Sequence, residues 1–90
     1  MKIIAVCGMG IGTSVLLKLN AEKVLRQLGI DAQVEAADMA TARRASFDAQ
    51  IVLTTPELVE SLKGISAEVI SVDHFFDLEE LTQKLSKALL

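Results

Sequence analysis

The sequence contains a single cysteine, Cys7, and it has neither tryptophan nor tyrosine. One thiol cannot form a disulfide within the chain, so a reducing compartment such as the cytoplasm is the expected setting. Because only 3% of the residues are aromatic while 51% are hydrophobic, the core must consist mainly of Val, Ile, Leu and Ala. This composition is typical of α/β packing, in which buried strands rich in Val and Ile are covered by helices.

Positive charge is also scarce, and the formal net charge is -3. Nucleic-acid binding requires clustered Lys and Arg, whereas the only adjacent basic pair here is Arg43-Arg44, which fits a solvated helix face. No apolar run approaches the roughly 18 to 20 residues that span a bilayer. Ninety residues are enough for one domain with one core, so residues 1–90 are expected to form a single unit.

Short apolar runs alternate with helical patterns along the chain. The four candidate strands are Ile3–Val6, Ala32–Ala36, Ile51–Leu53 and Val69–Val72. A helix is predicted between each pair of strands and after the last one. Such a βα series predicts a parallel sheet with right-handed crossovers and helices on both faces. The expected fold is a three-layer α-β-α, Rossmann-like arrangement with strand order 2-1-3-4.

Capping residues mark where the predicted helices begin and end. The first helix is expected from Thr13 to Gly29, and the second follows Asp38 and covers 39–45. The third is expected to run from Thr55, as its cap, through Pro56 to Gly64. The last is expected to begin at Asp77, where Asp77-Leu78-Glu79-Glu80 resembles a capping box, and to bury a stripe of leucines at 78, 81, 85 and 89.

In the order 2-1-3-4 the direction of winding reverses between strands 1 and 3. Ligands of open α/β sheets bind at such a point, beyond the carboxyl ends of the strands. Cys7 lies there, and so do the turns at Asp38, Thr54-Thr55 and Asp73-His74. His74 and the two aspartates are interpreted as local turn and hydrogen-bonding residues, because a carboxylate facing a phosphate would be unfavourable.

The segment Cys7-Gly8-Met9-Gly10-Ile11-Gly12-Thr13-Ser14 joins the first strand to the first helix. Three glycines at alternate positions let the backbone turn its N–H groups inward. The helix start adds further N–H groups and its positive dipole end, so the loop can cradle an anion. Thr13 and Ser14 can donate hydroxyl hydrogen bonds or cap the helix, and the same field favours the thiolate form of Cys7.

Three familiar phosphate-binding motifs do not fit this loop. A Walker loop needs lysine after its last glycine, where the chain has Thr13, and the dinucleotide pattern G-x-G-x-x-G started at Gly8 also fails at Thr13. Cysteine phosphatases and arsenate reductases use Cys-x5-Arg, but the sixth position after Cys7 is again Thr13. Without the arginine, hydrolysis loses its main charge stabilisation. A cysteine-dependent phosphatase-like enzyme, a non-catalytic anion- or nucleotide-binding module and a structural thiol stay open as alternatives.

The pattern Cys-x-x-Gly-x-Gly-Thr-Ser directly after a first strand, in a four-unit α/β chain, resembles enzyme IIB of the bacterial phosphotransferase system (PTS) for sugar uptake. The likeness covers essentially the whole chain, and its specific part is the loop 7–14. The chain is most similar to the lactose, galactitol and ascorbate branch, above all to ascorbate-specific IIB.

The resemblance implies a phosphohistidine–sugar phosphotransferase with a phosphocysteine intermediate. Cys7 would accept phosphate from a IIA phosphohistidine and pass it to a sugar, ascorbate or galactitol, held by membrane-embedded IIC. The implied phosphate-binding residues are Gly8, Met9, Gly10, Ile11, Gly12, Thr13 and Ser14. No metal or organic cofactor is implied, and the chain is expected to be monomeric, cytoplasmic and transiently at the inner face of the membrane. The missing arginine then has a reason: backbone donors hold the phosphoryl group without promoting attack by water.

Overall fold

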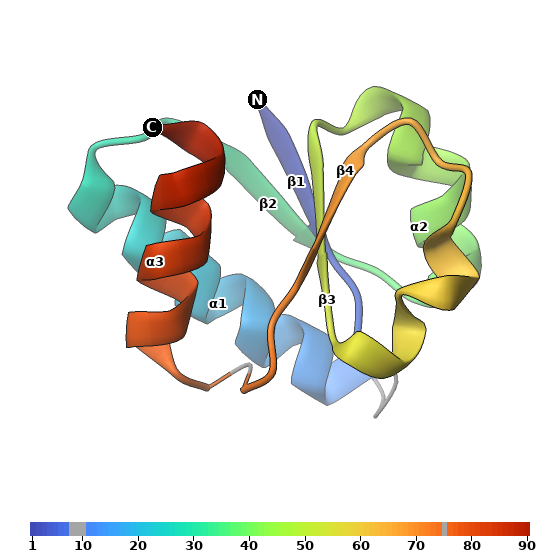
Figure 1. The fold of residues 1–90 in the computed structure, drawn as a ribbon, viewed down its shortest axis with the longest axis horizontal. Helices are drawn as coiled ribbons and strands as arrows, with labels where there is room; N and C mark the ends of the chain where they lie inside the picture. The colour runs from blue at the N-terminus through green and yellow to red at the C-terminus, as the bar shows by residue number, and fades with distance from the viewer. Residues whose placement is uncertain (8–10, 75) are drawn as a thin grey trace.

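The computed structural model describes residues 1–7, 11–74 and 76–90. Its main elements, in chain order, are β1 (Lys2–Ala5), α1 (Ile11–Leu28), β2 (Gln33–Ala36), α2 (Met39–Ala45), β3 (Ile51–Thr54), β4 (Glu68–Ser71) and α3 (Leu78–Leu89) (Figure 1). Three short 3-10 helices lie at Ser46–Asp48, Pro56–Leu58 and Glu60–Leu62. No helix in these ranges is long and apolar enough to cross a membrane.

The four strands form one parallel sheet in the order β2-β1-β3-β4, which confirms the predicted topology. β1 lies in the interior of the sheet, with Ile4 beside Glu35 on one flank and Val52 on the other. Val6 continues the pairing beyond β1, since its N–H donates to the Leu53 carbonyl over 2.8 Å. Cys7 therefore follows directly after a chain segment that is hydrogen-bonded to β3.

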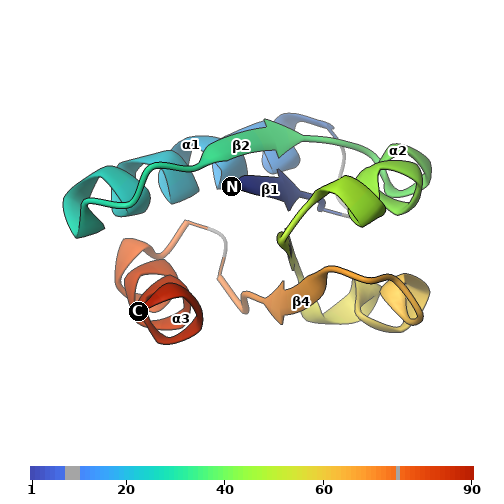
Figure 2. The same cartoon turned by 90° about the horizontal axis from the view of Figure 1, so that it is seen from above.

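Each face of the sheet packs against its own helices, as Figure 2 shows from above. One buried cluster joins alternate sheet residues such as Ile3 and Leu53 to α1 and α3, which contribute Leu17 and Leu81. The second cluster joins the intervening sheet residues to α2 and the 3-10 segment; its members include Ile4, Val52, Ala42 and Leu62. This confirms the three-layer α-β-α arrangement and follows from the two-residue side-chain period of strands.

The carboxyl ends of β1, β3 and β4 lie at one edge of the sheet, the lower edge in Figure 1. The start of α1, the turn after β3 and the segment between β4 and α3 lie along the same edge. Parallel strands place all their carboxyl ends together, so turns far apart in sequence become neighbours here. The sequence placed the candidate site at this edge.

The first helix begins two residues earlier than predicted, at Ile11 rather than Thr13. Thr13 therefore lies inside the first turn and is not a residue that precedes it. The predicted end at Gly29 is confirmed: Gly29 has φ +73 and its N–H donates to the Arg26 carbonyl over 3.2 Å. Thr13 was favoured as a cap because of its hydroxyl, but backbone hydrogen bonding extends the helix into the glycine-containing loop.

The predicted third helix is wrong as an α-helix, because the segment forms two successive 3-10 helices, Pro56–Leu58 and Glu60–Leu62. Thr55 precedes the first with extended backbone but makes no capping hydrogen bond; its hydroxyl donates to Glu57 over 2.7 Å. The N–H groups of Leu58, Val59, Leu62 and Lys63 each donate to the carbonyl three residues back, so the segment closes 3-10 turns in place of α-helical ones. Gly64 does end the segment as predicted, with φ +86.

Two helix starts follow their predicted capping residues. α2 covers Met39–Ala45, and the Asp38 carboxylate accepts a hydrogen bond of 2.7 Å from the Thr41 N–H. At α3 the Asp77 carboxylate accepts from the N–H groups of Glu79 and Glu80. The predicted leucine stripe of α3 is only partly correct, because Leu81 and Leu85 are buried while Leu78 is 37% exposed.

Candidate functional site

Cys7 is the first residue beyond the paired part of β1. Its thiol is free and buried, with 7% of the residue exposed. Val6, directly before it, is still held against β3 by its hydrogen bond to Leu53. The thiol therefore follows directly after an interior strand of the sheet, at the edge where ligands of such folds bind.

Only Gly8, Met9 and Gly10 separate Cys7 from the start of α1, and these three predicted site residues lie outside the described part of the chain. The other four predicted residues, 11–14, form the first turn of α1. The amides of a first turn point beyond the end of the helix, where the helix dipole places partial positive charge. The structure thus puts a helix N-terminus close in sequence to the only thiol.

Gly12 differs from the expectation for a loop glycine. Among the described glycines only Gly29 and Gly64 have positive φ, so Gly12 is an ordinary helical residue of the first turn. A Cβ atom built on Gly12 would meet no atom of the described residues within 4 Å. The first turn of α1 is consequently open on that side, and the absence of a side chain at Gly12 is required neither by strain nor by packing.

The hydroxyl-bearing residues of the site differ in their exposure. Ser14, in the first turn of α1, is buried, whereas Thr13 is half-exposed. At the end of β3 both Thr54 and Thr55 are buried. Thr54 was predicted only as a turn residue at the binding edge, yet its hydroxyl is the one buried side-chain polar atom for which the described residues offer no hydrogen-bond partner.

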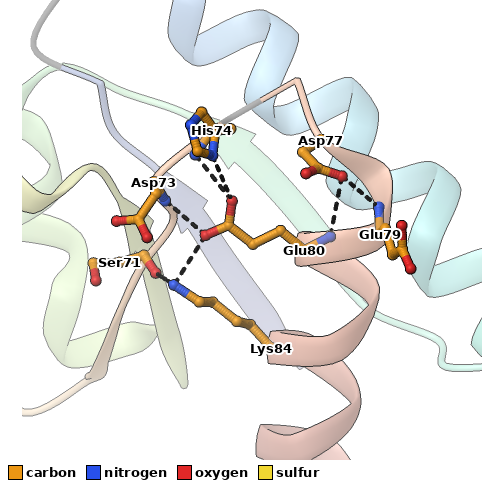
Figure 3. A network of polar contacts seen from close by, with 7 residues as sticks. All are labelled: Ser71, Asp73, His74, Asp77, Glu79, Glu80 and Lys84. Carbon is orange, nitrogen blue, oxygen red and sulfur yellow. Dashed lines mark hydrogen bonds and ion pairs between the residues drawn. The ribbon is translucent and has the colours of Figure 1, made fainter.

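A network centred on Glu80 holds the segment that follows β4 (Figure 3). The Glu80 carboxylate accepts hydrogen bonds from the N–H groups of Asp73, over 2.7 Å, and His74, over 3.0 Å. The Lys84 ammonium lies 3.1 Å from the same carboxylate and also donates to the Ser71 carbonyl. The Glu80 side chain is only 16% exposed. α3 is thereby tied to the carboxyl end of β4.

The capping-box prediction is therefore correct for Asp77 and wrong for Glu80. In a capping box the glutamate would reach back to the N–H of the capping residue. Here the Asp77 N–H donates to the His74 carbonyl instead, over 2.9 Å. The Glu80 carboxylate instead accepts from the N–H groups of Asp73 and His74, which precede Asp77 in the chain. The sequence pattern identified the glutamate but could not identify its partner, which depends on how β4 approaches α3.

His74, Asp77 and Glu80 bring their possible ligand atoms within 4.8 Å of one another, as a metal site would require. Their other contacts favour a structural role. Both Glu80 oxygens already accept backbone N–H groups, and the Lys84 ammonium stands beside them. A cation would have to displace these donors and approach a positive charge. The His74 ring contacts Glu80 at 3.5 Å and the Phe76 ring edge-on.

Replacing Glu80 by glutamine should change how stability depends on pH. Burial alone raises the pKa of Glu80, but the Asp73 N–H, the Lys84 ammonium and the His74 N–H together hold it below its usual 4.5. A carboxyl with a lowered folded-state pKa stabilises the fold above its unfolded-state pKa, and this stability is lost as pH falls through the folded-state value. We expect Glu80→Gln to lower the free energy of unfolding by about 1–2 kcal/mol at pH 7.

Urea unfolding at pH 7, 5, 4 and 3 measures this effect. The difference between wild type and Glu80→Gln should shrink below pH 4.5, the usual pKa of the carboxyl group. Glu79→Gln is the matched control, since Glu79 is exposed in the same turn of α3. A difference between wild type and Glu80→Gln that stays constant over the whole pH range would contradict the prediction.

Comparison with known proteins places this arrangement in a family. Residues 2–87 match the family described as PTS system, lactose/cellobiose specific IIB subunit. The chain is 36% identical over 88 residues to the ascorbate-specific PTS system EIIB component of Mycoplasma pneumoniae, an alignment that covers 97% of this chain and 93% of the relative.

A solved structure of a IIB domain has the same fold as this chain. The lactose-specific IIB component domain from Streptococcus pneumoniae superposes with a TM-score of 0.67, covering 99% of this chain and 94% of that one. At 15% identity this likeness concerns the fold alone. Together with the match over residues 2–87, the parallel sheet and the thiol at the end of β1 agree with the resemblance read from the sequence: the chain belongs to the PTS lactose/cellobiose-specific IIB family.

Proposed function

We propose that this protein is a phosphoryl carrier in which Cys7 is the phosphorylated residue. Membership of the IIB family supports a role in sugar phosphotransfer. The observation that carries the finer proposal is the position of the only thiol, just beyond β1 and separated by three residues from the N-terminus of α1. A thiolate beside backbone donors is suited to attack phosphorus and to hold the group that it receives.

The proposed cradle consists of the backbone amides of residues 8–14. Those of residues 11–14 belong to the first turn of α1, where amides and helix dipole both favour an anion. Gly8, Met9 and Gly10 would complete the cradle. The open space beside Gly12 leaves room for the phosphoryl group or an approaching donor. The Thr13 and Ser14 hydroxyls are further candidate donors.

Two in-line displacements make up the proposed reaction. The Cys7 thiolate attacks the phosphorus of a IIA phosphohistidine whose other ring nitrogen is protonated; the S–P bond forms, the N–P bond breaks, and the imidazole leaves neutral because it keeps that proton. A sugar hydroxyl then attacks the same phosphorus; the O–P bond forms, the S–P bond breaks, and the hydroxyl proton passes to a base or to water. The thiolate is regenerated, so neither a redox step nor a net change in the carrier occurs. The cradle serves both steps by stabilising charge on the phosphoryl oxygens.

IIB components work with IIA and IIC partners in general, and we propose that both meet this chain at the edge around Cys7. Three large apolar side chains of α1, Val15, Leu16 and Leu19, are 40–49% exposed close after the first turn. Such exposure beside a reacting group fits a face that contacts other proteins. The M. pneumoniae relative is ascorbate-specific, which makes ascorbate the proposed sugar. Transfer to IIC would take place at the cytoplasmic face of the membrane, with residues 1–90 acting as one IIB domain.

The direct test is intact-mass analysis after incubation with a phosphoenolpyruvate-driven donor mixture that includes a IIA protein. We expect the chain to gain one phosphoryl group, and peptide mapping to place it on Cys7. Released inorganic phosphate without an adduct would indicate a phosphatase. An unchanged mass would refute the carrier proposal.

A further inference from the structure

The outward face of α1 carries exposed side chains that recur every three or four residues, so they lie in line along the helix. We call this set the α1 stripe; it comprises Val15, Leu16, Leu19, Lys23 and Arg26. The opposite side of the helix is buried in the core through residues such as Leu17 and Ala21. At a rise of 1.5 Å per residue, the stripe is about 16 Å long. It starts just beyond the first turn of α1, beside the binding edge, and leads away from it.

The half of the α1 stripe nearer to the binding edge is apolar. Single exposed apolar side chains are ordinary on a protein surface, but Val15, Leu16 and Leu19 are large and lie within two turns of one helix face. The packing of α1 on the sheet and on α3 uses the other side of the helix and leaves these three uncovered. An exposed apolar group of this kind marks a surface that another protein covers.

The other half of the stripe is basic. Lys23 and Arg26 are exposed, and neither takes part in an ion pair within residues 1–7, 11–74 and 76–90. α1 contains three basic residues and one acidic residue, Glu22, although the whole chain has a formal net charge of -3. Positive charge is thus concentrated on this helix of an otherwise acidic protein. The stripe is complementary to a surface that combines an apolar patch with neighbouring carboxylates.

Of the two partners in the proposed function, the phosphoryl donor suits this charge. In the first transfer the negative phosphoryl group arrives on the IIA protein. In the second transfer it is already bound to this chain, and the acceptor is a neutral sugar hydroxyl. A basic face attracts an anionic partner and raises the rate of productive encounter. The cations of α1 therefore favour the encounter with the loaded donor.

We propose that the α1 stripe is the docking face for the phosphorylated IIA donor. An apolar patch of the donor covers Val15, Leu16 and Leu19, and its carboxylates face Lys23 and Arg26. The inference rests on the proposed function and names the part of the chain that recognises the donor. Lys23 and Arg26 lie about three to four helical turns beyond the start of α1. They consequently act on donor binding and not on the chemistry at Cys7.

Reversal of both cations, Lys23→Glu with Arg26→Glu, tests the charged half of the stripe. Initial rates of Cys7 phosphorylation are measured by quenched intact-mass spectrometry at increasing concentrations of phosphorylated IIA protein. At low ionic strength we expect kcat/KM to fall about tenfold, with kcat within about twofold of wild type. The difference should largely disappear in about 0.5 M NaCl, because salt screens charges on exposed side chains.

A second variant and a matched control separate the two halves of the stripe from general effects. Leu19→Ala removes apolar contact area, so KM should rise about fivefold, to the same extent at low and high salt. Lys63→Glu with Lys87→Glu makes the same change in net charge at exposed positions outside α1 and should leave KM within about twofold of wild type. The midpoint of thermal unfolding of each variant, which checks the fold, should stay within about 5 °C of wild type.

Three results would overturn the inference. Wild-type kinetics in both α1 variants would show that the donor does not dock on the stripe. An equal loss in the control with Lys63 and Lys87 reversed would show that only the total charge matters. A defect confined to transfer from the phosphorylated chain to sugar, measured with vesicles that contain IIC, would assign the stripe to IIC instead. If wild type itself is never phosphorylated, the proposed function fails; if wild type is phosphorylated and the α1 variants match it, only this inference fails.

Discussion

Replacement of Cys7 by serine is expected to abolish phosphoryl transfer through this protein. Serine has an alcohol in place of the thiol, and an alcohol without an adjacent general base is a far weaker nucleophile than a thiolate. We expect the rate of phosphoryl transfer from IIA phosphohistidine to fall on the order of a thousandfold or more. Time-resolved intact-mass spectrometry with equal amounts of wild type and variant measures this rate.

The interpretation requires that the variant remains folded. Cys7 is buried, but serine is smaller and introduces no steric clash, so thermal unfolding should stay cooperative. Cys7→Ala is a useful companion, because it removes the nucleophile without burying a hydroxyl. A folded Cys7→Ser or Cys7→Ala protein that still carries phosphate to a sugar would contradict the assignment of Cys7.

Placing arginine at position 13 should convert a durable phosphocysteine into a short-lived one. Thr13 is the sixth residue after Cys7, the position of the arginine in Cys-x5-Arg phosphatases. An arginine can pair with two phosphoryl oxygens and stabilise the charge of the transition state for attack by water. We expect the half-life of phosphocysteine in Thr13→Arg to shorten by about a hundredfold.

The half-life is measured by intact mass after removal of the donor proteins. Thr13→Gln is the matched control, since it has a long polar side chain without charge and should change the half-life by less than about threefold. Both substitutions are sterically reasonable because Thr13 is half-exposed in the first turn of α1. An unchanged half-life in Thr13→Arg would refute the explanation offered for the missing cation.

Local patterns were sufficient to predict most elements of the fold. The four short apolar runs became the four strands, each within one residue of its predicted bounds at both ends, because buried parallel strands need continuous β-branched and apolar residues. Asp38 and Asp77 begin their helices as predicted, since a carboxylate capping nearby N–H groups is a contact within a few residues. Gly29 and Gly64 end α1 and the 3-10 segment with positive φ, which glycine adopts without steric strain.

Predictions failed where the outcome depended on contacts between distant segments. The segment 55–64 contains good helix signals, yet it forms 3-10 turns, in which Leu58 and Leu62 pack with Val52 of β3 in the second cluster. Glu80 carried the signature of a capping box, but the approach of β4 to α3 brought the N–H groups of Asp73 and His74 within its reach. Neither outcome could be read from neighbouring residues.

For function, the sequence by itself determined the features on which the proposed chemistry rests: one thiol at the end of a strand, a glycine-rich turn, and no arginine at position 13. These properties are local, because the strand, the turn and the helix that form the loop are consecutive in the chain. Only the tertiary structure decided that Thr54 stands on the strand beside Cys7 with an unsatisfied hydroxyl. Strand order and register bring the ends of β1 and β3 side by side, although some 50 residues separate them in the chain. No pattern within a few residues contains that information.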